Sequence, residues 1–376
     1  MLSTEQAQHR PLRIAIDATN VKPGQGGIRT YALGVARNLA RVEGLKVYVV
    51  VRQNDQEDWG DCEVVRSALK SEDPQVRIAW RELKLPAYIS RLNVDLLFVP
   101  APEALYRSPV PQAIVVHDVG PLVAPAVYGW PRFARYAATL RRACKRAEMV
   151  ICVSESTRLD LARTVSPALS NLVVVGQGTQ TSQITPADRR SARIGWTGDD
   201  SYSLYVGAAL PHKNLQTLIR TYESVTEQMP KRLVLVGPEY GSEVKELMVS
   251  ANTQTTEHRG FVSVSELTNL YAGASLLLFP SIHEGFGIPL VEAMQLGLPV
   301  VASRIPSLVE VGADAVTFVD RPLDPLDWRL RIEEICTDPS HARLLAKRGV
   351  ERACDFTWDA QIADLVHRLR TISTSK

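Results

Sequence analysis

Two glutamates, Glu284 and Glu292, stand on either side of a glycine-rich loop with seven residues between them. The apolar run at 275–280 before the loop predicts a buried strand. Pro289 suits the first position of a helix, where its missing N–H costs nothing. We therefore expect Glu284 in the loop after the strand and Glu292 about one turn into the helix.

This loop has the features of a phosphate site. Gly285 and Gly287 would let the backbone approach a ligand closely, and the N–H groups at a helix start favour negative charge. Carboxylates, in contrast, accept strong hydrogen bonds from sugar hydroxyls. A nucleotide sugar has hydroxyls on both sides of its diphosphate, so one acid fits each end. The alternative is a helix start that carries acids only because its dipole favours them.

A second segment places a lysine where negative charge would collect. A strand predicted to end at Gly207 is followed by His212 and Lys213, at the start of the next helix. A fixed cation there would stabilise a departing diphosphate, whose charge develops in the transition state. The alternative is a lysine on a solvated helix start.

The first half of the chain adds two candidates. His117 follows the predicted strand 113–116 and could hydrogen-bond a sugar hydroxyl, although a lone histidine is more often structural. Gly26 and Gly27 open a helix, and their amides could approach a diphosphate. The spacing does not fit a dinucleotide fingerprint, because Arg29 takes the third glycine position. A plain tight turn is the alternative for this loop.

The segment from Ser281 to Glu292, followed by Gly297-Leu298-Pro299-Val300, resembles the E-x7-E signature of retaining GT-B glycosyltransferases of the GT4 family. The resemblance extends over most of the chain and is most specific at 205–310. It implies that Glu284 binds hydroxyls of the donor sugar and that Glu292 binds the ribose. It also implies that the amides of Phe286, Gly287 and Ile288 face the sugar and diphosphate.

The same resemblance matches Lys213 to the family's phosphate-binding lysine and His117 to a histidine near the donor sugar, with Asp118 to orient its ring. The family often has an arginine where this chain has Ala208 or His212. The second cation is therefore left open between His212, Arg29 and Arg304. The predicted catalytic residues are His117, Lys213 and Glu284, and the predicted donor-binding residues are Gly26, Gly27, Gly207, His212, Phe286, Gly287, Ile288 and Glu292.

Short apolar runs alternate with helical patterns along the whole chain. The predicted strands lie at 12–16, 47–51, 96–99, 113–116, 150–153 and 172–175, then at 204–206, 233–236, 276–279, 300–302 and 316–319. Helices are predicted between them at 28–41, 131–146, 154–164, 215–228, 243–251, 264–271 and 289–296. Buried strands that alternate with helices predict parallel sheets covered on both faces.

The expected fold class is α/β, and two such series predict two Rossmann-like domains with the ligand between them. We expect residues 1–180 to form an acceptor-binding domain, 181–355 a nucleotide-sugar-binding domain, and 177–201 to contain the linker. The resemblance implies a GT-B fold, in which both sheets face a central cleft and a C-terminal helix, here 356–376, returns to the first domain.

Composition excludes several classes of protein. A chain of 376 residues exceeds one ordinary core, and a net charge of +2 does not suit a general polyanion binder. The five cysteines show no metal-ligand spacing, so no metal site is predicted. We find no signal peptide and no apolar run of membrane-spanning length, and expect a cytoplasmic protein.

The predicted helix from Trp130 to Arg146 is strongly basic and also contains aromatic side chains. Its cations are Arg132, Arg135, Arg141, Arg142, Lys145 and Arg146. Such a helix can lie on an anionic membrane, which would suit a lipid-linked acceptor and a peripheral place at the inner face of the membrane. A solvated basic face is the equal alternative, and no motif for nucleic-acid binding accompanies the patch.

The resemblance implies retaining transfer of a hexose from GDP- or UDP-hexose to a hydroxyl acceptor, without metal or cofactor. Mannose from GDP-mannose is the first expectation, and the acceptor would be a saccharide, a lipid-linked sugar or a small molecule. Two alternatives stay open: a sugar-nucleotide 2-epimerase on the same architecture, and a non-catalytic nucleotide-sugar-binding partner of a synthase complex.

Overall fold

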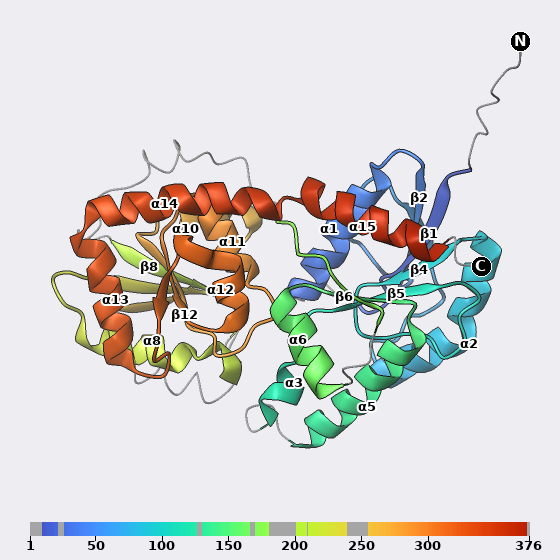
Figure 1. The fold of residues 1–376 in the computed structure, drawn as a ribbon, viewed down its shortest axis with the longest axis horizontal. Coiled ribbons are helices and arrows are strands. Elements are labelled where there is room, and N and C mark those ends of the chain that lie inside the picture. Colours follow the sequence, from blue (N-terminus) through green and yellow to red (C-terminus); the bar gives the residue numbers. More distant parts are fainter. Residues whose placement is uncertain are drawn as a thin grey trace, which may run out of the picture.

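A computed structural model describes residues 10–21, 26–125, 130–165, 170–179, 201–208, 210–238 and 255–373. These residues form two parallel sheets with helices on both faces, and two successive C-terminal helices run from the second domain to the first (Figure 1). The predicted boundary at 180/181, most of the predicted linker and the predicted helix at 243–251 lie outside the described residues.

The first sheet has the strand order β3-β2-β1-β4-β5-β6-β7, and all its pairs are parallel. Its strands are β1 (Leu12–Asp17), β2 (Leu45–Val51), β3 (Glu63–Arg66), β4 (Leu96–Val99), β5 (Gln112–Val116), β6 (Met149–Cys152) and β7 (Leu172–Val174). Its helices are α1 (Gly27–Ala40), α2 (Pro74–Leu92), α3 (Gly120–Val123), α5 (Trp130–Arg146) and α6 (Glu155–Thr164).

The second sheet repeats this pattern in the order β10-β9-β8-β11-β12-β13. Its strands are β8 (Tyr202–Val206), β9 (Arg232–Val236), β10 (Thr256–His258), β11 (Leu276–Phe279), β12 (Val300–Ser303) and β13 (Thr317–Val319). Its helices are α8 (Leu215–Thr221), α10 (Val264–Gly273), α11 (Ile288–Gln295), α12 (Pro306–Gly312), α13 (Pro325–Thr337) and α14 (Pro339–Ala353).

The predicted α/β class with two Rossmann-like sheets is therefore confirmed. Sequence reasoning missed β3, α2 and β10, because they carry polar residues where a buried element usually has apolar ones. It also did not predict α13 and α14. The helix predicted at 215–228 is shorter: α8 ends at Thr221 and a 3₁₀ turn follows.

The strand order reverses between β1 and β4 in the first sheet and between β8 and β11 in the second. Loops that leave the sheet at such a point diverge, so the space outside the carboxyl ends of these strands is the usual ligand site of an open α/β sheet. The loop that carries Gly26 follows β1, Lys213 follows β8 and Glu284 follows β11. The topology therefore places the predicted site residues at both reversal points.

Helix α15 (Trp358–Ser373) returns from the second domain and packs against α1 of the first (Figure 1). The indole of Trp358 fills the space where a Cβ on Gly34 would lie, 2.0 Å from the ring. Ile362, Leu365 and Leu369 continue this buried face. The predicted C-terminal helix that crosses back to the first domain is confirmed.

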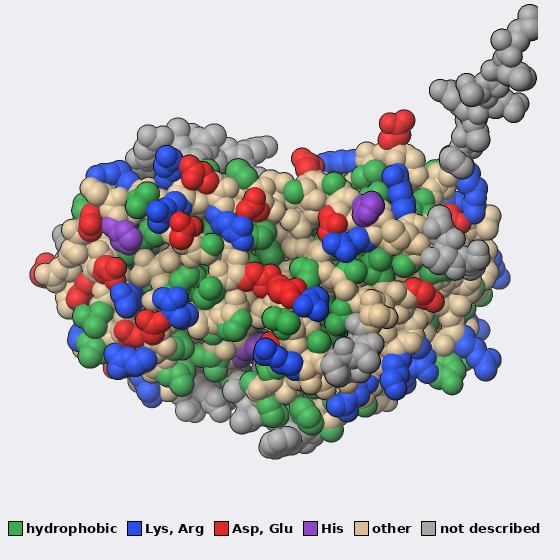
Figure 2. Space-filling model, in the orientation of Figure 1, with side chains coloured by type: hydrophobic (Ala, Val, Ile, Leu, Met, Phe, Trp, Pro, Cys, Tyr) green, Lys and Arg blue, Asp and Glu red, His purple; other side chains and the backbone are tan. Residues whose placement is uncertain are grey.

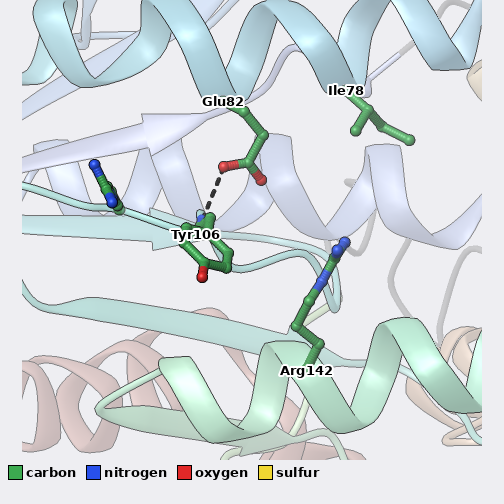
Figure 3. Close-up of a pocket in the computed structure, with 5 residues that line it drawn as sticks. Ile78, Glu82, Tyr106 and Arg142 are labelled. Atoms are coloured by element: carbon green, nitrogen blue, oxygen red, sulfur yellow. Dashed lines mark hydrogen bonds between the residues drawn. The ribbon is translucent and has the colours of Figure 1, made fainter.

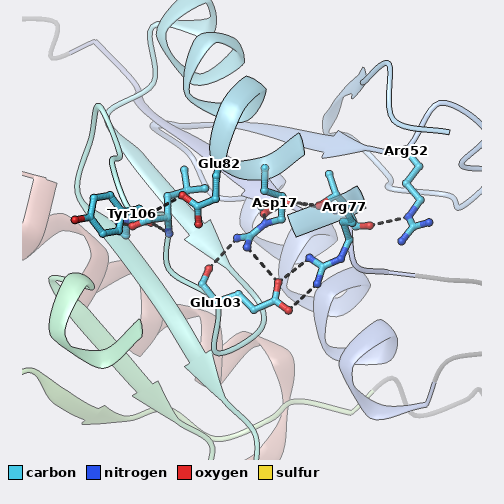
Figure 4. A network of polar contacts seen from close by, with 10 residues as sticks. Asp17, Arg52, Arg77, Glu82, Glu103 and Tyr106 are labelled. Atoms are coloured by element: carbon cyan, nitrogen blue, oxygen red, sulfur yellow. Dashed lines mark hydrogen bonds and ion pairs between the residues drawn. The ribbon is translucent and has the colours of Figure 1, made fainter. Parts of the chain in front are cut away.

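A buried ion network fixes the end of β1 (Figure 4). Arg81 on α2 donates to Asp17 over 2.5 Å and to the Glu103 carbonyl over 2.8 Å. Arg77, one turn earlier, forms two hydrogen bonds of 2.7 Å with the Glu103 carboxylate. Burial opposes ionisation of Asp17, but Arg81 and the hydrogen bonds from Thr19 outweigh it and lower the pKa of this carboxyl group.

Replacing Arg81 should therefore destabilise the first domain by more than the loss of its buried side-chain surface would cost. Arg81→Met leaves Asp17 as an uncompensated buried charge, which typically costs about 3–5 kcal/mol. The deficit should be largest near neutral pH and shrink as the pH falls, because protonation of Asp17 then removes the buried charge.

Thermal unfolding of Arg81→Met and of the control Lys84→Met, an exposed position on the same helix, would measure this at neutral and acidic pH. The control should stay close to wild type. Equal midpoints for the two variants at neutral pH would show that the network contributes little to stability.

Candidate active site

The loop between β11 and α11 has the predicted form. Gly287 is the residue before α11 and has φ of 103°, a conformation that a residue with a Cβ rarely adopts. A Cβ there would also lie 2.7 Å from a methyl group of Leu308. Pro289 occupies the first turn, where no helical N–H bond is lost. Glu284 therefore projects from a loop of fixed shape, and Glu292 lies on the helix that follows.

Gly285 packs directly against the main chain of the first domain. A Cβ on Gly285 would lie 1.6 Å from the backbone oxygen of His117, at the end of β5. No other residue fits without moving this backbone. We expected this glycine to admit a ligand, and in the structure it admits the main chain of the first domain instead.

Lys213 and Glu284 form an ion pair. The Lys213 Nζ donates to the Glu284 Oε1 over 2.5 Å, and the side chains are 19% and 12% exposed. Burial raises the pKa of Glu284, but the charge and hydrogen bond of Lys213 outweigh this and hold the pKa below its ordinary value. The Ile282 amide also donates to the His212 carbonyl over 2.8 Å. The loops after β8 and β11 thus act as one unit with an ionised acid and a lysine at its centre.

The three candidates for a second cation are not equivalent. Burial, reinforced by Lys213, lowers the pKa of His212 to about 4, so this imidazole is neutral at physiological pH. Arg29 forms two hydrogen bonds with the carboxylate of Glu57. Arg304 is paired with Asp320 and is half exposed. His212 is therefore neutral in this structure, while each of the two arginines already has a carboxylate partner.

Glu292 has the opposite electrostatic environment from Glu284. Burial raises its pKa to about 7, and the hydrogen bond that the Tyr271 hydroxyl donates over 2.8 Å only partly offsets this. Glu292 is thus poised between its neutral and ionised forms near neutral pH. Sequence reasoning missed Tyr271, because this tyrosine lies on α10 and reaches Glu292 only in the folded domain.

His117 lies at the predicted strand end, but its surroundings differ from our expectation. Its Nε2 is 3.0 Å from the carbonyl of Pro100, and its Nδ1 is 3.1 Å from the side-chain nitrogen of Gln177. A carbonyl only accepts, so Nε2 carries the proton and Nδ1 accepts from the amide. Burial lowers the pKa of the ring, which is therefore neutral.

Asp118 does not orient the His117 ring as we expected. Its carboxylate accepts from the Gly120 amide over 2.9 Å, while the edge of the imidazole packs against Tyr31 with ring centroids 4.9 Å apart. Both ring nitrogens of His117 are engaged within the protein. A bond from His117 to a sugar hydroxyl would require one of these partners, Pro100 or Gln177, to be exchanged.

The backbone amides predicted to contact the donor differ in whether they already have a hydrogen-bond partner. Helices α1 and α11 have Gly26 and Gly287 as their N-cap residues and, like α3, α8 and α12, have no side-chain cap among the described residues. Helices α2, α6, α10, α13 and α14 are capped by Asp or Ser side chains. The Gly207 amide is instead bonded to the Val236 carbonyl over 2.9 Å. Phe286 is buried edge-on against Phe356, with ring centroids 5.4 Å apart.

Uncapped helix starts carry amides that suit a diphosphate. Gly27 at the start of α1 and Ile288 at the start of α11 therefore fit the predicted role better than Gly207 does. Within the described residues, no group of three or more His, Cys, Asp or Glu side chains could hold a metal ion. No helix of the described chain is long and apolar enough to cross a membrane.

Comparison with known families agrees with this geometry. Residues 25–183 match the family "Glycosyltransferase Family 4", and residues 187–352 match "Glycosyl transferases group 1". The chain is 28% identical over 254 residues to O-antigen chain mannosyltransferase B of Escherichia coli, a match over 65% of this chain and 66% of that protein. It is 29% identical over 227 residues to the O-antigen chain mannosyltransferase RfbU of Salmonella typhimurium, over 60% of each chain.

The chain therefore spans slightly less than two thirds of the length of these relatives. Among solved structures, sucrose-phosphate synthase from Thermosynechococcus elongatus matches with a TM-score of 0.81 at 21% identity, over 97% of this chain and all of that one. WaaG, a glycosyltransferase of lipopolysaccharide biosynthesis, matches with a TM-score of 0.72 at 19% identity, over 96% of this chain and all of that one. These structures have the same fold, and the two family matches together extend along most of the sequence: the chain belongs to the GT4-type glycosyltransferases of the GT-B fold.

Proposed function

We propose that this protein transfers a hexose from a nucleotide sugar to a hydroxyl acceptor with retention at the anomeric carbon. The observation that carries this proposal is the Lys213–Glu284 pair at the reversal point of the second sheet, with Glu292 on the helix that follows. This arrangement offers a cation for a diphosphate between two acids for hydroxyls. Family membership favours transfer over the 2-epimerase and the non-catalytic partner.

Each residue has a distinct task in this proposal. Lys213 neutralises the diphosphate as the bond from the anomeric carbon to phosphate oxygen breaks, with the amides of α1 and α11 as further donors. Glu284 accepts hydrogen bonds from the sugar, and Glu292 accepts them from the ribose. Because Lys213 engages Glu284, this carboxylate is a poor nucleophile. We infer that the acceptor oxygen attacks the face that the diphosphate leaves, and that its proton passes to the departing phosphate.

Mannose is our first candidate for the sugar, because two of the relatives are named O-antigen chain mannosyltransferases. GDP-mannose is accordingly the first donor to test. Anabaena HepE, a structural neighbour, was solved with UDP-glucose, so UDP-hexoses are the second. We propose a growing saccharide as the acceptor, and no metal or cofactor in the reaction, because Lys213 supplies positive charge at the leaving group.

We also propose that the first domain contacts anionic lipid through α5 and its neighbours. Figure 2 shows Lys and Arg side chains gathered over this part of the domain. Arg135, Arg141, Arg142 and Lys145 are exposed. Phe133 and Tyr136 are partly buried and pack against the core of the first domain.

A pocket beside α5 could bind the phosphate of a lipid headgroup (Figure 3). It has a volume of about 380 Å³ and lies between α2, the β4–β5 loop and α5. Its lining residues are Ile78, Glu82, Tyr106, Arg107 and Arg142. Tyr106 is 62% exposed, and Arg146 lies over its ring at 4.2 Å. Cations beside exposed apolar side chains suit a headgroup at a membrane surface.

The role of Lys213 predicts a specific kinetic loss. Lys213→Ala should lower kcat by roughly 10²–10³, because the leaving diphosphate loses its cation. Lys231→Ala is the control, since Lys231 also pairs with a glutamate but lies away from the loops after β8 and β11. Transfer from GDP-mannose and UDP-hexoses would be measured for both variants. Near-normal turnover of Lys213→Ala would contradict the assignment.

The raised pKa of Glu292 predicts that nucleotide affinity depends on pH. The ionised carboxylate is the better acceptor for ribose hydroxyls, so affinity for GDP or UDP should rise as the pH passes upward through about 7. Glu292→Gln should bind more weakly by about 1–3 kcal/mol at alkaline pH and should lose this dependence.

Calorimetric titration of wild type and Glu292→Gln across this range would separate the effect from ionisation of the nucleotide itself, which both proteins share. Stability should move in the opposite direction. A carboxyl group with a raised folded pKa contributes its full stabilisation below its ordinary pKa of 4.5 and loses it as the pH rises through the folded pKa of about 7. Parallel affinity profiles for the two proteins would argue against Glu292 as the ribose ligand.

Membrane contact predicts salt-sensitive binding to vesicles. Each suitably placed cation near an anionic surface contributes up to about 1 kcal/mol, which salt screens. Co-sedimentation should increase with the anionic lipid fraction, fall at high ionic strength and be lost in Arg107→Glu/Arg142→Glu. The control Arg343→Glu lies on α14 of the second domain. If the wild-type protein does not bind anionic vesicles at low salt, this basic surface is only solvated and the proposed membrane contact is wrong.

A further inference from the structure

The start of α6 makes polar contacts with the second domain. Ser154 is its N-cap residue and is 1% exposed. The Ser154 Oγ accepts from the Thr157 amide over 3.0 Å and donates to the Gly285 carbonyl of the other domain over 2.6 Å. The Thr157 hydroxyl lies 3.3 Å from the same carbonyl. Ser154 thus caps its own helix and also binds the carbonyl of Gly285, the residue after Glu284.

Glu310 completes this contact from α12 of the second domain. Its Oε1 accepts from the Glu155 amide over 2.7 Å, and its Oε2 accepts from the Ser156 amide over 2.8 Å. These amides belong to the first turn of α6, where the helix dipole favours a negative charge. The second domain therefore adds a carboxylate to a helix start that already has Ser154 as its N-cap residue and Glu155 in its first turn.

The contacts of Ser154 and Glu310 lie beside the place where Gly285 packs against the first domain. Gly285, which Ser154 holds by its carbonyl, packs without space for a Cβ against the His117 carbonyl. Glu284 directly precedes it and pairs with Lys213. A displacement of the Gly285 peptide would therefore move Glu284 relative to the first domain, where an acceptor would bind.

We propose that Ser154, Thr157 and Glu310 are positioning residues that form an interdomain clamp. The clamp holds Gly285 by its carbonyl against the end of β5 and so aligns donor and acceptor. This role rests on the proposed transfer reaction. The clamp consists of hydrogen bonds to amides and a carbonyl, groups that water can satisfy when the domains part, so it can release and re-form during turnover.

Two substitutions separate the clamp from the stability of α6. Ser154→Asp retains a good N-cap residue but cannot donate to the Gly285 carbonyl, which its carboxylate would repel. Glu310→Gln keeps the shape of the side chain and removes the charge that the α6 dipole attracts. Asp314→Asn is the control, because Asp314 is an exposed acid after α12 that pairs with Arg348 of its own domain.

Three measurements test the proposal on the full chain. Small-angle scattering should show a larger radius of gyration for both clamp variants than for wild type and the control. Affinity for GDP or UDP should stay within about twofold, because most of the proposed nucleotide contacts, namely Lys213, Glu292 and the start of α11, belong to the second domain. Transfer should fall roughly 10- to 100-fold in kcat, as misplaced reactants do, and a larger share of donor should be hydrolysed by water.

Unchanged scattering and unchanged transfer in both variants would overturn the clamp. A loss of nucleotide affinity and thermal stability in proportion to the loss of kcat would also overturn it, since a purely structural role predicts that pattern. If wild type transfers no sugar from any nucleotide donor, the proposed function fails, and the scattering comparison still decides whether these residues hold the domains together.

Discussion

The site depends on one steric constraint, the contact of Gly285 with the His117 carbonyl. There is no space for a side chain at this point, so the carboxyl ends of β5 and of β11 come together main chain to main chain. Glu284 is thereby fixed at the domain boundary, within reach of Lys213 from the loop after β8. The left-handed backbone at Gly287 then turns the chain into α11 and carries Glu292 away from the boundary.

Around this contact, similar groups have been given different charge states by their surroundings. Glu284 is held ionised by Lys213, while burial without a cation leaves Glu292 near its midpoint at neutral pH. His212 is kept neutral by burial and by the adjacent Lys213. Environments that push the pKa values of titratable groups apart are typical of sites that assign them separate roles. Here they concentrate positive charge on Lys213, where a diphosphate would lie.

Much of this arrangement could be predicted because it is local in sequence. Buried parallel strands are continuous apolar runs, and the glycine and proline pattern at 285–289 determines a loop followed by a helix. What could not be predicted arises from contacts between distant segments: the Pro100 and Gln177 partners of His117, and Tyr271 beside Glu292. The α2 helix escaped detection because its inward face carries Arg77 and Arg81, whose partners come from other loops.

The contacts that join the domains differ in kind, and this difference has a consequence for motion. Helix α15 is held on the first domain by the buried Trp358 and by aliphatic side chains, an apolar contact that is costly to expose to water. The contact at α6 is made of hydrogen bonds, which water can replace. The α14–α15 junction lies at a short 3₁₀ turn, Cys354–Phe356. Separation of the domains should therefore leave α15 in place and open the molecule at α6, with this turn near the hinge.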